Sequence, residues 1–435
     1  MSDDGKKEKT VYVGITGDII HPGIINIIQQ GAKYGRLIVG LLTNSAIVTH
    51  KRIPYLTYEQ RKAVLENIKG VSEVVPQEDW SYVPNLKKLK PDYIIHGDDW
   101  KTNYLKNIRE EVFEVMKKIG GEVIEIPYTK GINSSKLFED KINIGITAGQ
   151  RLKSLKELMN YKPYLRIMEA YSGLSGLIIE NLKIEKEDGI HRFDGIFISV
   201  SNDIKNLGIF EPESSSPSSK LNVISDIIEC TTKPIICGGY TCDMQDNLSL
   251  IVEQLELKGI SAIIIEDKCK KITVSGNIQE LVNEEEFSYK IKEAKKGQTT
   301  SDFMVVAGIE ELAFGKSVEE ALKKANTSIK AGADGISVSS KEKSGDNIKA
   351  FCLKFREENK DIPIILIPTS YNQYTEKELS EWGANIIIYA DYLVRATYPA
   401  MKKCAETILS SERSLEVNQM CMPIKEILNL IPGTN

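Results

Sequence analysis

The sequence predicts an α/β protein in which a Rossmann-like parallel sheet is followed by a TIM-type (β/α)8 barrel. Short apolar runs alternate with helical patterns along almost the whole chain, and this alternation is typical of parallel sheets whose strands are joined by helices. The chain has 435 residues, which is too long for one small domain, and 41% of them are hydrophobic, which is enough for large buried cores.

The first unit is expected over residues 10–136 and contains five strands. The strands are expected at 11–16, 36–43, 71–76, 92–97 and 121–128, and helices at 24–34, from about Thr57 to 70, at 83–90 and at 106–120. Ligands of such a sheet bind at the carboxyl ends of the strands. The loops that follow the strands are therefore the places to look for a site.

The second unit is expected over residues 166–432, after a helical linker at 137–165. Seven strands are readable in about 260 residues, at 193–199, 233–238, 261–267, 303–308, 334–339, 362–368 and 385–390. A TIM barrel has eight strands, so one strand is not recognised in the sequence. This eighth strand is expected near LSGLIIE at 174–180. The serine-rich stretch 214–219 is expected to be a loop over the barrel mouth.

Charge and composition exclude several classes of protein. Lys and Arg number 56 against 61 Asp and Glu, a net charge of −5, so a basic surface for nucleic acid or anionic membrane is not expected. The chain has no apolar run of bilayer length and begins with the charged MSDDGKKEKT, so a cytoplasmic protein is expected. Its seven cysteines fit reduced thiols. Cys237 and Cys242 with Asp243 make an incomplete ligand set for zinc.

The loop after the first strand, Gly17 to Ile24, is the first candidate site. A glycine-containing loop between a parallel strand and a helix presents backbone N–H groups to phosphates, and the imidazole of His21 can stabilise phosphate charge there. Taken alone, a histidine in such a loop is more often structural than catalytic.

Residues 10–136 resemble the cytidylyltransferase superfamily. Asp18, His21 and Gly23 match its G-x-F-D-x-x-H-x-G-H motif. Further matching segments are Lys51 with Arg52, the turn His96, Gly97, Asp98, Asp99 and Trp100, and the pair Ser134 and Ser135. The resemblance implies CTP binding with Mg²⁺, phosphates held by His21 and Lys51, and a nucleotide framed by the turn and the two serines. The second histidine of the motif is Ile24 here, so the site lacks one donor.

The chain from Met168 to Leu428 resembles phosphoenolpyruvate mutase of the isocitrate lyase superfamily. The resemblance is carried by FDGIFIS, GISAIIIEDK, DFMVVAGIEELAFGKSVEEALKKA, YADYLVRATYPAM and CMPIKEIL. It implies a site for Mg²⁺ and a small phosphonate or phosphate at the strand ends, and a phosphonate-pathway fusion of two enzymes. Glu266 and Lys268 are the catalytic residues that the resemblance retains.

Several residues of this second site depart from the family pattern. Its D-x-D-T-G motif reads Gly238 to Cys242, which removes two metal carboxylates. Gly308 replaces an arginine, Ser339 a histidine, and the loop from Lys271 to Ser275 lacks an asparagine. No metal is therefore expected in the barrel. Without the family context, Glu266 and Asp267 would be solvated or salt-bridged carboxylates, and the lysines that follow a solvated loop.

Two functions stay open on this evidence. The first is a phosphonate-pathway type of fusion that has lost mutase activity and retains weakened cytidylyl transfer from CTP. The alternative is a non-catalytic pseudoenzyme that acts as a self-assembling or partner-binding scaffold. In both cases a homo-oligomer is expected through the barrel, because the segment after Tyr392 has an apolar stripe that includes Met401, Cys404 and Leu409.

Overall fold

The computed structural model describes residues 8–101, 105–127, 147–186, 189–199, 217–242, 247–273 and 276–430. The chain divides into two compact units, residues 1–142 with 183–191 and residues 143–182 with 192–435. We describe the two units separately.

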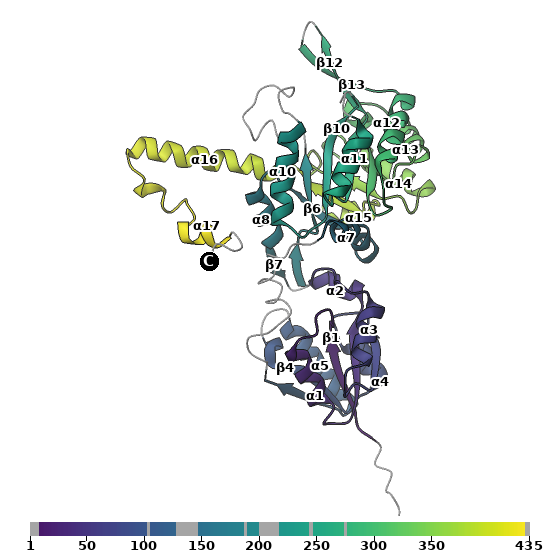
Figure 1. The fold of residues 1–435 in the computed structure, drawn as a ribbon, viewed down its shortest axis with the longest axis vertical. Coiled ribbons are helices and arrows are strands. Elements are labelled where there is room, and N and C mark those ends of the chain that lie inside the picture. Colours follow the sequence, from purple (N-terminus) through teal and green to yellow (C-terminus); the bar gives the residue numbers. More distant parts are fainter. Residues whose placement is uncertain are drawn as a thin grey trace, which may run out of the picture. The chain divides into compact units, whose positions relative to one another are not determined.

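The first unit is built on a five-stranded parallel sheet (Figure 1). Its strands are β1 (Thr10–Ile15), β2 (Arg36–Leu42), β3 (Glu73–Gln77), β4 (Tyr93–Gly97) and β5 (Glu122–Ile126). The order is β3-β2-β1-β4-β5, so β1 pairs with β2 on one side and with β4 on the other. The chain reverses its winding direction between β1 and β4, and such a switch point opens a crevice at the strand ends. The Rossmann-like fold is therefore confirmed.

The helices of this unit agree with the sequence except for one. They are α1 (Pro22–Gly31), α2 (Asn44–His50), α3 (Tyr58–Glu66), α4 (Val83–Leu89), the 3-10 turn η1 (Asp98–Lys101) and α5 (Leu105–Ile119). Thr57 caps α3 in a capping box with Gln60. The unpredicted helix is α2, whose seven residues are too few to show a helical repeat and are capped by Thr43.

Both faces of the sheet are buried. Val11 and Val13 of β1 pack in one apolar layer, whereas Tyr12 between them packs in the other layer with Trp100. This alternation follows from the two-residue period of a strand. The sheet therefore has an apolar core on each of its faces.

The second unit contains a closed eight-stranded parallel barrel. Around the barrel its strands are β10 (Ile235–Thr241), β11 (Ala262–Glu266), β14 (Met304–Ile309), β15 (Gly335–Val338), β16 (Ile364–Leu366), β17 (Ile386–Tyr389), β6 (Leu165–Glu169) and β9 (Gly195–Ser199). The TIM-type barrel is confirmed.

Two local predictions in the barrel are wrong. The eighth strand is β6, and the LSGLIIE stretch is instead helix α8 (Gly173–Asn181), which Ser172 caps. The strand was missed because LRIME is short and contains two charged residues, Arg166 and Glu169, whereas LSGLIIE contains four large aliphatic residues. The serine-rich loop is also shorter than predicted, since α10 (Pro217–Cys230) begins inside it with proline at the first helical position.

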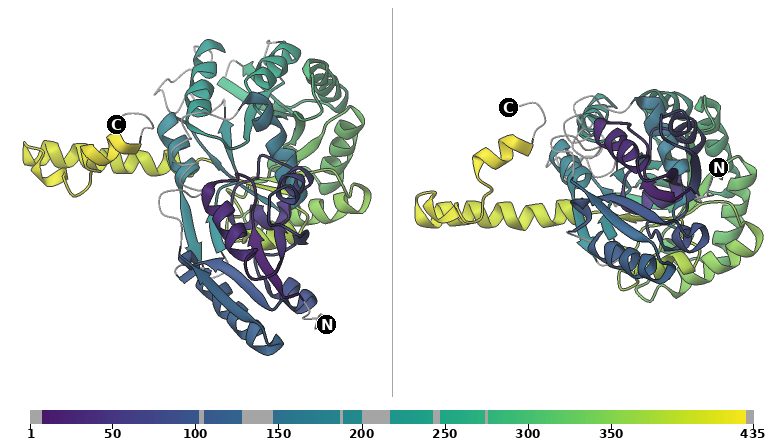
Figure 2. Two further views of the ribbon diagram at one scale, coloured as in Figure 1. Left: turned by 60° about the horizontal axis from the view of Figure 1, so that its bottom comes forward. Right: turned by 90° about the horizontal axis from the view of Figure 1, so that it is seen from below.

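The remaining helices of this unit lie on the barrel wall or leave it. Those on the wall are α7 (Ala148–Tyr161), α11 (Leu248–Leu257), α12 (Glu284–Gly297), α13 (Val318–Lys330), α14 (Asp346–Glu358) and α15 (Glu376–Glu381), with the short turn η4 (Glu311–Phe314). After β17 the chain forms α16 (Tyr392–Ser411), the turn η5 (Leu415–Val417) and α17 (Ile424–Leu430). We call residues 392–430 the C-terminal arm. It extends away from the barrel in both views of Figure 2.

Two hairpins complete the fold. They are β7 (Lys183–Lys186) with β8 (Gly189–Arg192), and β12 (Lys268–Thr273) with β13 (Gly276–Leu281). The lysines after Asp267, expected in a solvated loop, thus lie in strand β12. Among the described residues no helix is both long and apolar enough for a bilayer.

Candidate active sites

Asp18 orders the loop that follows β1. Its carboxylate accepts hydrogen bonds from the Arg52 side chain at 2.6 Å and from the backbone N–H groups of Tyr55 and Leu56 at 2.7 and 3.3 Å. A carboxylate with these partners ties the β1–α1 loop to the 52–56 segment. Asp18 therefore stabilises the loop. Both of its carboxylate oxygens accept hydrogen bonds from the protein, and these are the atoms that a metal ion would need as ligands.

His21 and Lys51 form the cationic side of the same loop. His21 lies at the N-cap of α1, and its buried Nδ1 atom has no hydrogen-bond partner in the described structure. Burial and the nearby Lys51 ammonium lower the pKa of His21. The Lys51 ammonium lies 5.5 Å from the centre of the Trp80 ring. Gly23 is buried in the first turn of α1.

Arg61 is a buried residue that the sequence did not single out. Its guanidinium donates to the carbonyl of Thr16 after β1 at 2.5 Å, to the carbonyl of Leu42 at the end of β2 at 2.8 Å, and to the Asn44 side chain at 2.5 Å. Arg61 therefore locks the carboxyl ends of two neighbouring strands. The burial of Arg61 could have been predicted from the sequence, because Arg61 and Leu65 are one helical turn apart and lie on the same side of α3.

Aromatic and charged side chains stabilise the turn after β4 from the side of the core. The rings of His96 and Trp100 stack at 3.9 Å, and the Trp100 indole donates to Glu125 at 2.8 Å. Arg109 also donates to Glu125, and this contact is the main reason why the pKa of Glu125 falls to about 2. Trp100 is only 1% exposed, so it supports the turn from the core.

The other predicted nucleotide residues are placed in part. Gly97 ends β4 and Asp98 begins η1, at the strand end beside that of β1. The side chain of Asp99 and residues Ser134 and Ser135 lie outside the described structure. His21 follows β1 and the 97–98 turn follows β4, and these neighbouring strands flank the switch point of the sheet.

At the mouth of the barrel, Lys268 lies between two carboxylates. Its ammonium is 2.7 Å from Glu266 and 3.6 Å from Glu310. Burial raises the pKa of Glu266, while the attraction of Lys268 acts in the opposite direction. The internal ammonium therefore neutralises carboxylates that would otherwise attract a cation.

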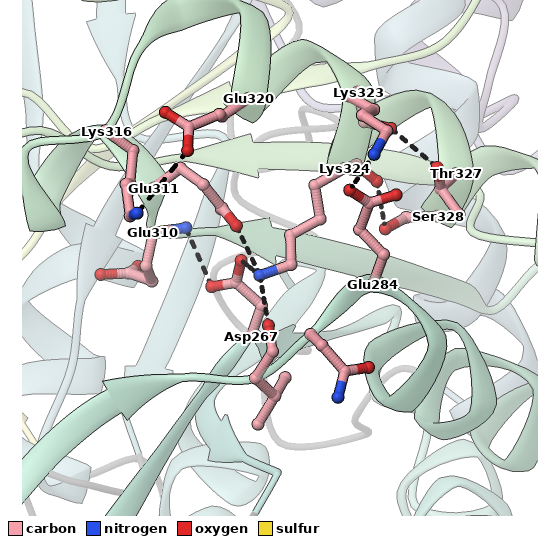
Figure 3. A network of polar contacts seen from close by, with 12 residues as sticks. Asp267, Glu284, Glu310, Glu311, Lys316, Glu320, Lys323, Lys324, Thr327 and Ser328 are labelled. Carbon is pink, nitrogen blue, oxygen red and sulfur yellow. Dashed lines mark hydrogen bonds and ion pairs between the residues drawn. The ribbon is translucent and has the colours of Figure 1, made fainter.

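Behind this group lies a second, fully buried network (Figure 3). The Lys324 ammonium is 2.9 Å from the Asp267 carboxylate, contacts Glu311, and donates to the carbonyl of Val282 at 2.7 Å. Asp267 also accepts from the backbone N–H of Glu310 at 3.0 Å. Burial, and then Glu311, raise the pKa of Asp267 to about 8. The network fixes the positions of the two strand ends that carry Glu266 and Glu310.

At Gly238, the position of one missing metal carboxylate, an aromatic ring fills the space beside the backbone. A Cβ atom at Gly238 would lie 2.6 Å from the Phe197 ring of the neighbouring strand β9. At Gly308 it would lie 3.1 Å from the carbonyl of Ile265 and 3.3 Å from Glu266. With the ring over Gly238 and Lys268 on Glu266, the residues present do not fit a hydrated magnesium ion.

Cys242, a member of the incomplete zinc set, is buried at the end of β10. Its thiol donates to the carbonyl of Glu266 at 3.3 Å, and burial raises its pKa to about 12. The buried Cys242 thiol is thus engaged with the backbone at the end of β11. Asp243, the third member of the incomplete set, lies outside the described residues.

Comparison with known proteins identifies the family of the barrel. Residues 155–409 match the family described as Phosphoenolpyruvate phosphomutase. The chain belongs to this phosphomutase family. A phosphoenolpyruvate phosphomutase from Tetrahymena pyriformis is 31% identical over 285 residues, which cover 65% of this chain and 91% of the relative. The isocitrate lyase superfamily expectation is confirmed with it.

The N-terminal unit matches a second family, so the chain is a fusion. Residues 12–140 match the family described as Cytidylyltransferase-like. The glycerol-3-phosphate cytidylyltransferase of Bacillus spizizenii (strain ATCC 23059 / NRRL B-14472 / W23) is 30% identical over 139 residues, 32% of this chain and 99% of the relative. The predicted fusion of cytidylyltransferase-like and phosphomutase-like domains is therefore confirmed.

A solved structure also matches the barrel. It is a phosphonopyruvate hydrolase in complex with oxalate and Mg²⁺, with a TM-score of 0.55 and 28% identity. The match covers 66% of this chain and 95% of that one. That relative holds Mg²⁺, whereas this phosphomutase-family barrel has Phe197 over Gly238.

Proposed function

We propose that the N-terminal unit binds CTP with Mg²⁺ and transfers its cytidylyl group to the hydroxyl of a small phosphate or phosphonate. The observation that carries this proposal is the buried Nδ1 atom of His21, which has no partner among the described residues and lies near Lys51. A buried polar atom without a partner costs free energy, and a phosphate oxygen at the switch point would satisfy it. The cytidylyltransferase relative supports the choice of nucleotide.

The reaction is a displacement at the α-phosphorus of the nucleotide. The acceptor hydroxyl forms the new O–P bond, the α–β anhydride bond breaks, pyrophosphate leaves, and the hydroxyl proton passes to solvent. His21 and Lys51 stabilise the charge that develops on the phosphates, and the Asp18–Arg52 pair keeps their loop in place. Mg²⁺ would be held largely by the phosphates, because the Asp18 oxygens are engaged with the loop.

Turnover is slower than in a site with two histidines. Ile24, where the second imidazole would stand, packs partly against the apolar layer of β1. The loss of one such donor typically costs about 10²- to 10³-fold in rate. Binding needs fewer donors than turnover, so CTP affinity is retained better than the rate.

Titration calorimetry with CTP and Mg²⁺, followed by a pyrophosphate-release assay, tests this proposal. Glycerol 3-phosphate and a hydroxyalkylphosphonate serve as acceptors, and ATP serves as the matched nucleotide control. We expect CTP binding and slow, acceptor-dependent pyrophosphate release. CTP binding without release would favour the scaffold alternative, and no CTP binding would overturn the proposal.

We propose further that the barrel does not interconvert phosphoenolpyruvate and phosphonopyruvate. The support is the Phe197 ring over Gly238, together with the ion pairs of Lys268 with Glu266 and Glu310, which engage the Lys268 ammonium. Phosphorus NMR with concentrated protein and excess Mg²⁺ tests this, and conversion above background would overturn it. Gly308→Arg alone should not restore turnover, because it adds no metal ligand.

The retained role of the barrel is assembly, through the C-terminal arm. Helix α16 follows the last strand but has no buried residue, although an eighth helix normally covers the barrel wall. On the outer wall, a hollow of about 430 Å³ is lined by Arg166, Met168, Phe193, Tyr389 and Tyr392, among others. We infer that α16 of a second copy covers this hollow, and that the exchange is reciprocal.

A further inference from the structure

Two thiols meet within the C-terminal arm. The Sγ atoms of Cys404 in α16 and of Cys421 are 3.9 Å apart. The seven cysteines of the chain are free thiols, and burial raises the pKa of both Cys242 and Cys352 to about 12. Cys421, in contrast, is exposed, so an oxidant in solution reaches this pair directly.

Local contacts in the arm set the position of Cys421 over α16. Glu412 adopts the left-handed conformation, with φ 50°, and reverses the chain at the end of the helix. Val417 is buried, and its carbonyl accepts from the backbone N–H of Cys421 at 3.1 Å. Arg413 pairs with Glu416 at 2.5 Å and closes the same turn. The two thiols therefore face each other through the fold of the arm itself.

We propose that Cys404 and Cys421 are an oxidisable dithiol that forms an intrachain disulfide and fastens residues 413–421 to α16. A disulfide bond is about 2.05 Å long, so the two sulfurs must approach by about 2 Å, which side-chain rotation in an exposed arm can provide.

Hydrogen peroxide is the class of oxidant that fits an exposed thiol. The Cys421 sulfur attacks one peroxide oxygen, the O–O bond breaks, and a sulfenic acid and one water form. The Cys404 sulfur then attacks the Cys421 sulfur and displaces the second water. Two thiols and one peroxide thus give one disulfide and two waters. The contact with Cys421 raises the pKa of Cys404, which agrees with Cys421 reacting first.

The disulfide would close a loop between positions 404 and 421. Such a cross-link restricts the open conformations of the segment that it spans. Oxidation would therefore hold residues 413–421 against α16. The buried cysteines of the core are protected from the oxidant. Nothing in this inference depends on catalysis by either unit.

Peptide mapping of the full-length protein tests the proposal. After peroxide treatment, alkylation and trypsin digestion, we expect residues 404–413 linked to residues 414–425, with a mass two hydrogens below the sum of the two peptides. In limited digestion, cleavage after Arg413 should release the C-terminal fragment only when a reductant is added.

Two substitutions serve as the matched comparison. Cys421→Ser should remove the linked peptide and leave Cys404 open to alkylation, whereas Cys230→Ser should leave the link intact. Circular dichroism checks that each variant is folded. The proposal is overturned if both thiols stay alkylatable after peroxide, if Cys404 links to Cys230 or Cys269 as often as to Cys421, or if the link joins two chains on a non-reducing gel.

Discussion

At the scale of single residues, charges at the end of β1 divide into structural and ligand-facing groups. Asp18 and Arg52 are paired at 2.6 Å and hold the loop. His21 has a buried nitrogen without a partner in the described structure, next to Lys51. The roles of the two groups can therefore be distinguished by substituting their residues one at a time.

Lys51→Ala should weaken the binding of CTP with Mg²⁺. The change removes a positive charge beside the phosphates, which corresponds to about 1–3 kcal/mol, or roughly 5- to 150-fold in Kd. Titration calorimetry measures the effect. Lys118→Ala on the exposed side of α5 is the control and should leave Kd unchanged. An unchanged Kd for Lys51→Ala would mean that the pocket does not bind phosphates through this residue.

Ile24→His should raise cytidylyl transfer, by up to about 10²- to 10³-fold. The new imidazole supplies the donor that the motif lacks. Ile24 is packed partly against the core, so a small loss of thermal stability is expected as well. Initial rates of pyrophosphate release report the gain. A folded variant with an unchanged rate would show that more than one donor is missing.

Arg61→Met should destabilise the N-terminal unit by about 2–6 kcal/mol. The substitution leaves the carbonyls of Thr16 and Leu42 without their buried donor, and each buried unpaired group costs about 1–3 kcal/mol. Urea denaturation measures the change. Arg36→Met, which breaks an exposed ion pair with Glu73, should cost no more than about 1 kcal/mol. Equal effects would contradict the proposed lock.

At the scale of elements, the ends of β11 and β14 are joined by the network around Asp267. Its folded-state pKa of about 8 lies above the ordinary value of 3.8, so the folded barrel binds more protons than the unfolded chain between these pH values. The free energy of unfolding should therefore fall as pH rises from about 4 to 8.

Asp267→Asn should reduce this pH dependence. An amide imitates the protonated carboxyl, so the contribution of this residue, on the order of 1–3 kcal/mol across the window, should disappear. Denaturation curves at several pH values test it. Asp361→Asn on the surface is the control. If the Asp267→Asn protein keeps the pH slope of the parent, the titrating group lies elsewhere.

At the scale of the whole molecule, the C-terminal arm carries the proposal of assembly. Leu409 is 79% exposed and Met401 is 66% exposed, on a helix with no buried residue. Such apolar exposure indicates an interface. We expect an oligomer for the full chain and a monomer for the Met401→Glu, Leu409→Glu double variant, measured by light scattering.

The control for this change is Leu257→Glu, because Leu257 is 73% exposed on α11 but lies outside the arm. This variant should keep the parent subunit number. A chain ending before Met420 separates the two parts of the arm. If it stays oligomeric, α16 alone forms the interface, and a monomeric full-length protein would refute assembly altogether.

The sequence by itself determined the fold class, both family resemblances and the strand-end positions of the candidate residues. These features depend on local information: the period of apolar residues, capping residues such as Thr57, and motifs such as Asp18 with His21. The sequence also identified the missing residues of the barrel, since Gly238 and Gly308 are visible without coordinates.

Only the tertiary structure decided what replaced the missing residues and which groups act together. Phe197 and Gly238 lie 41 positions apart and meet only because strands β9 and β10 pair side by side in the barrel. Asp267 and Lys324, and likewise Arg61 and Thr16, are partners through strand and helix packing, which no local pattern encodes. The eighth strand was also decided in this way, because the charges of LRIME point to partners on other elements, such as Glu376 for Arg166. Long-range contacts of this kind determine which charged and polar groups interact at both candidate sites.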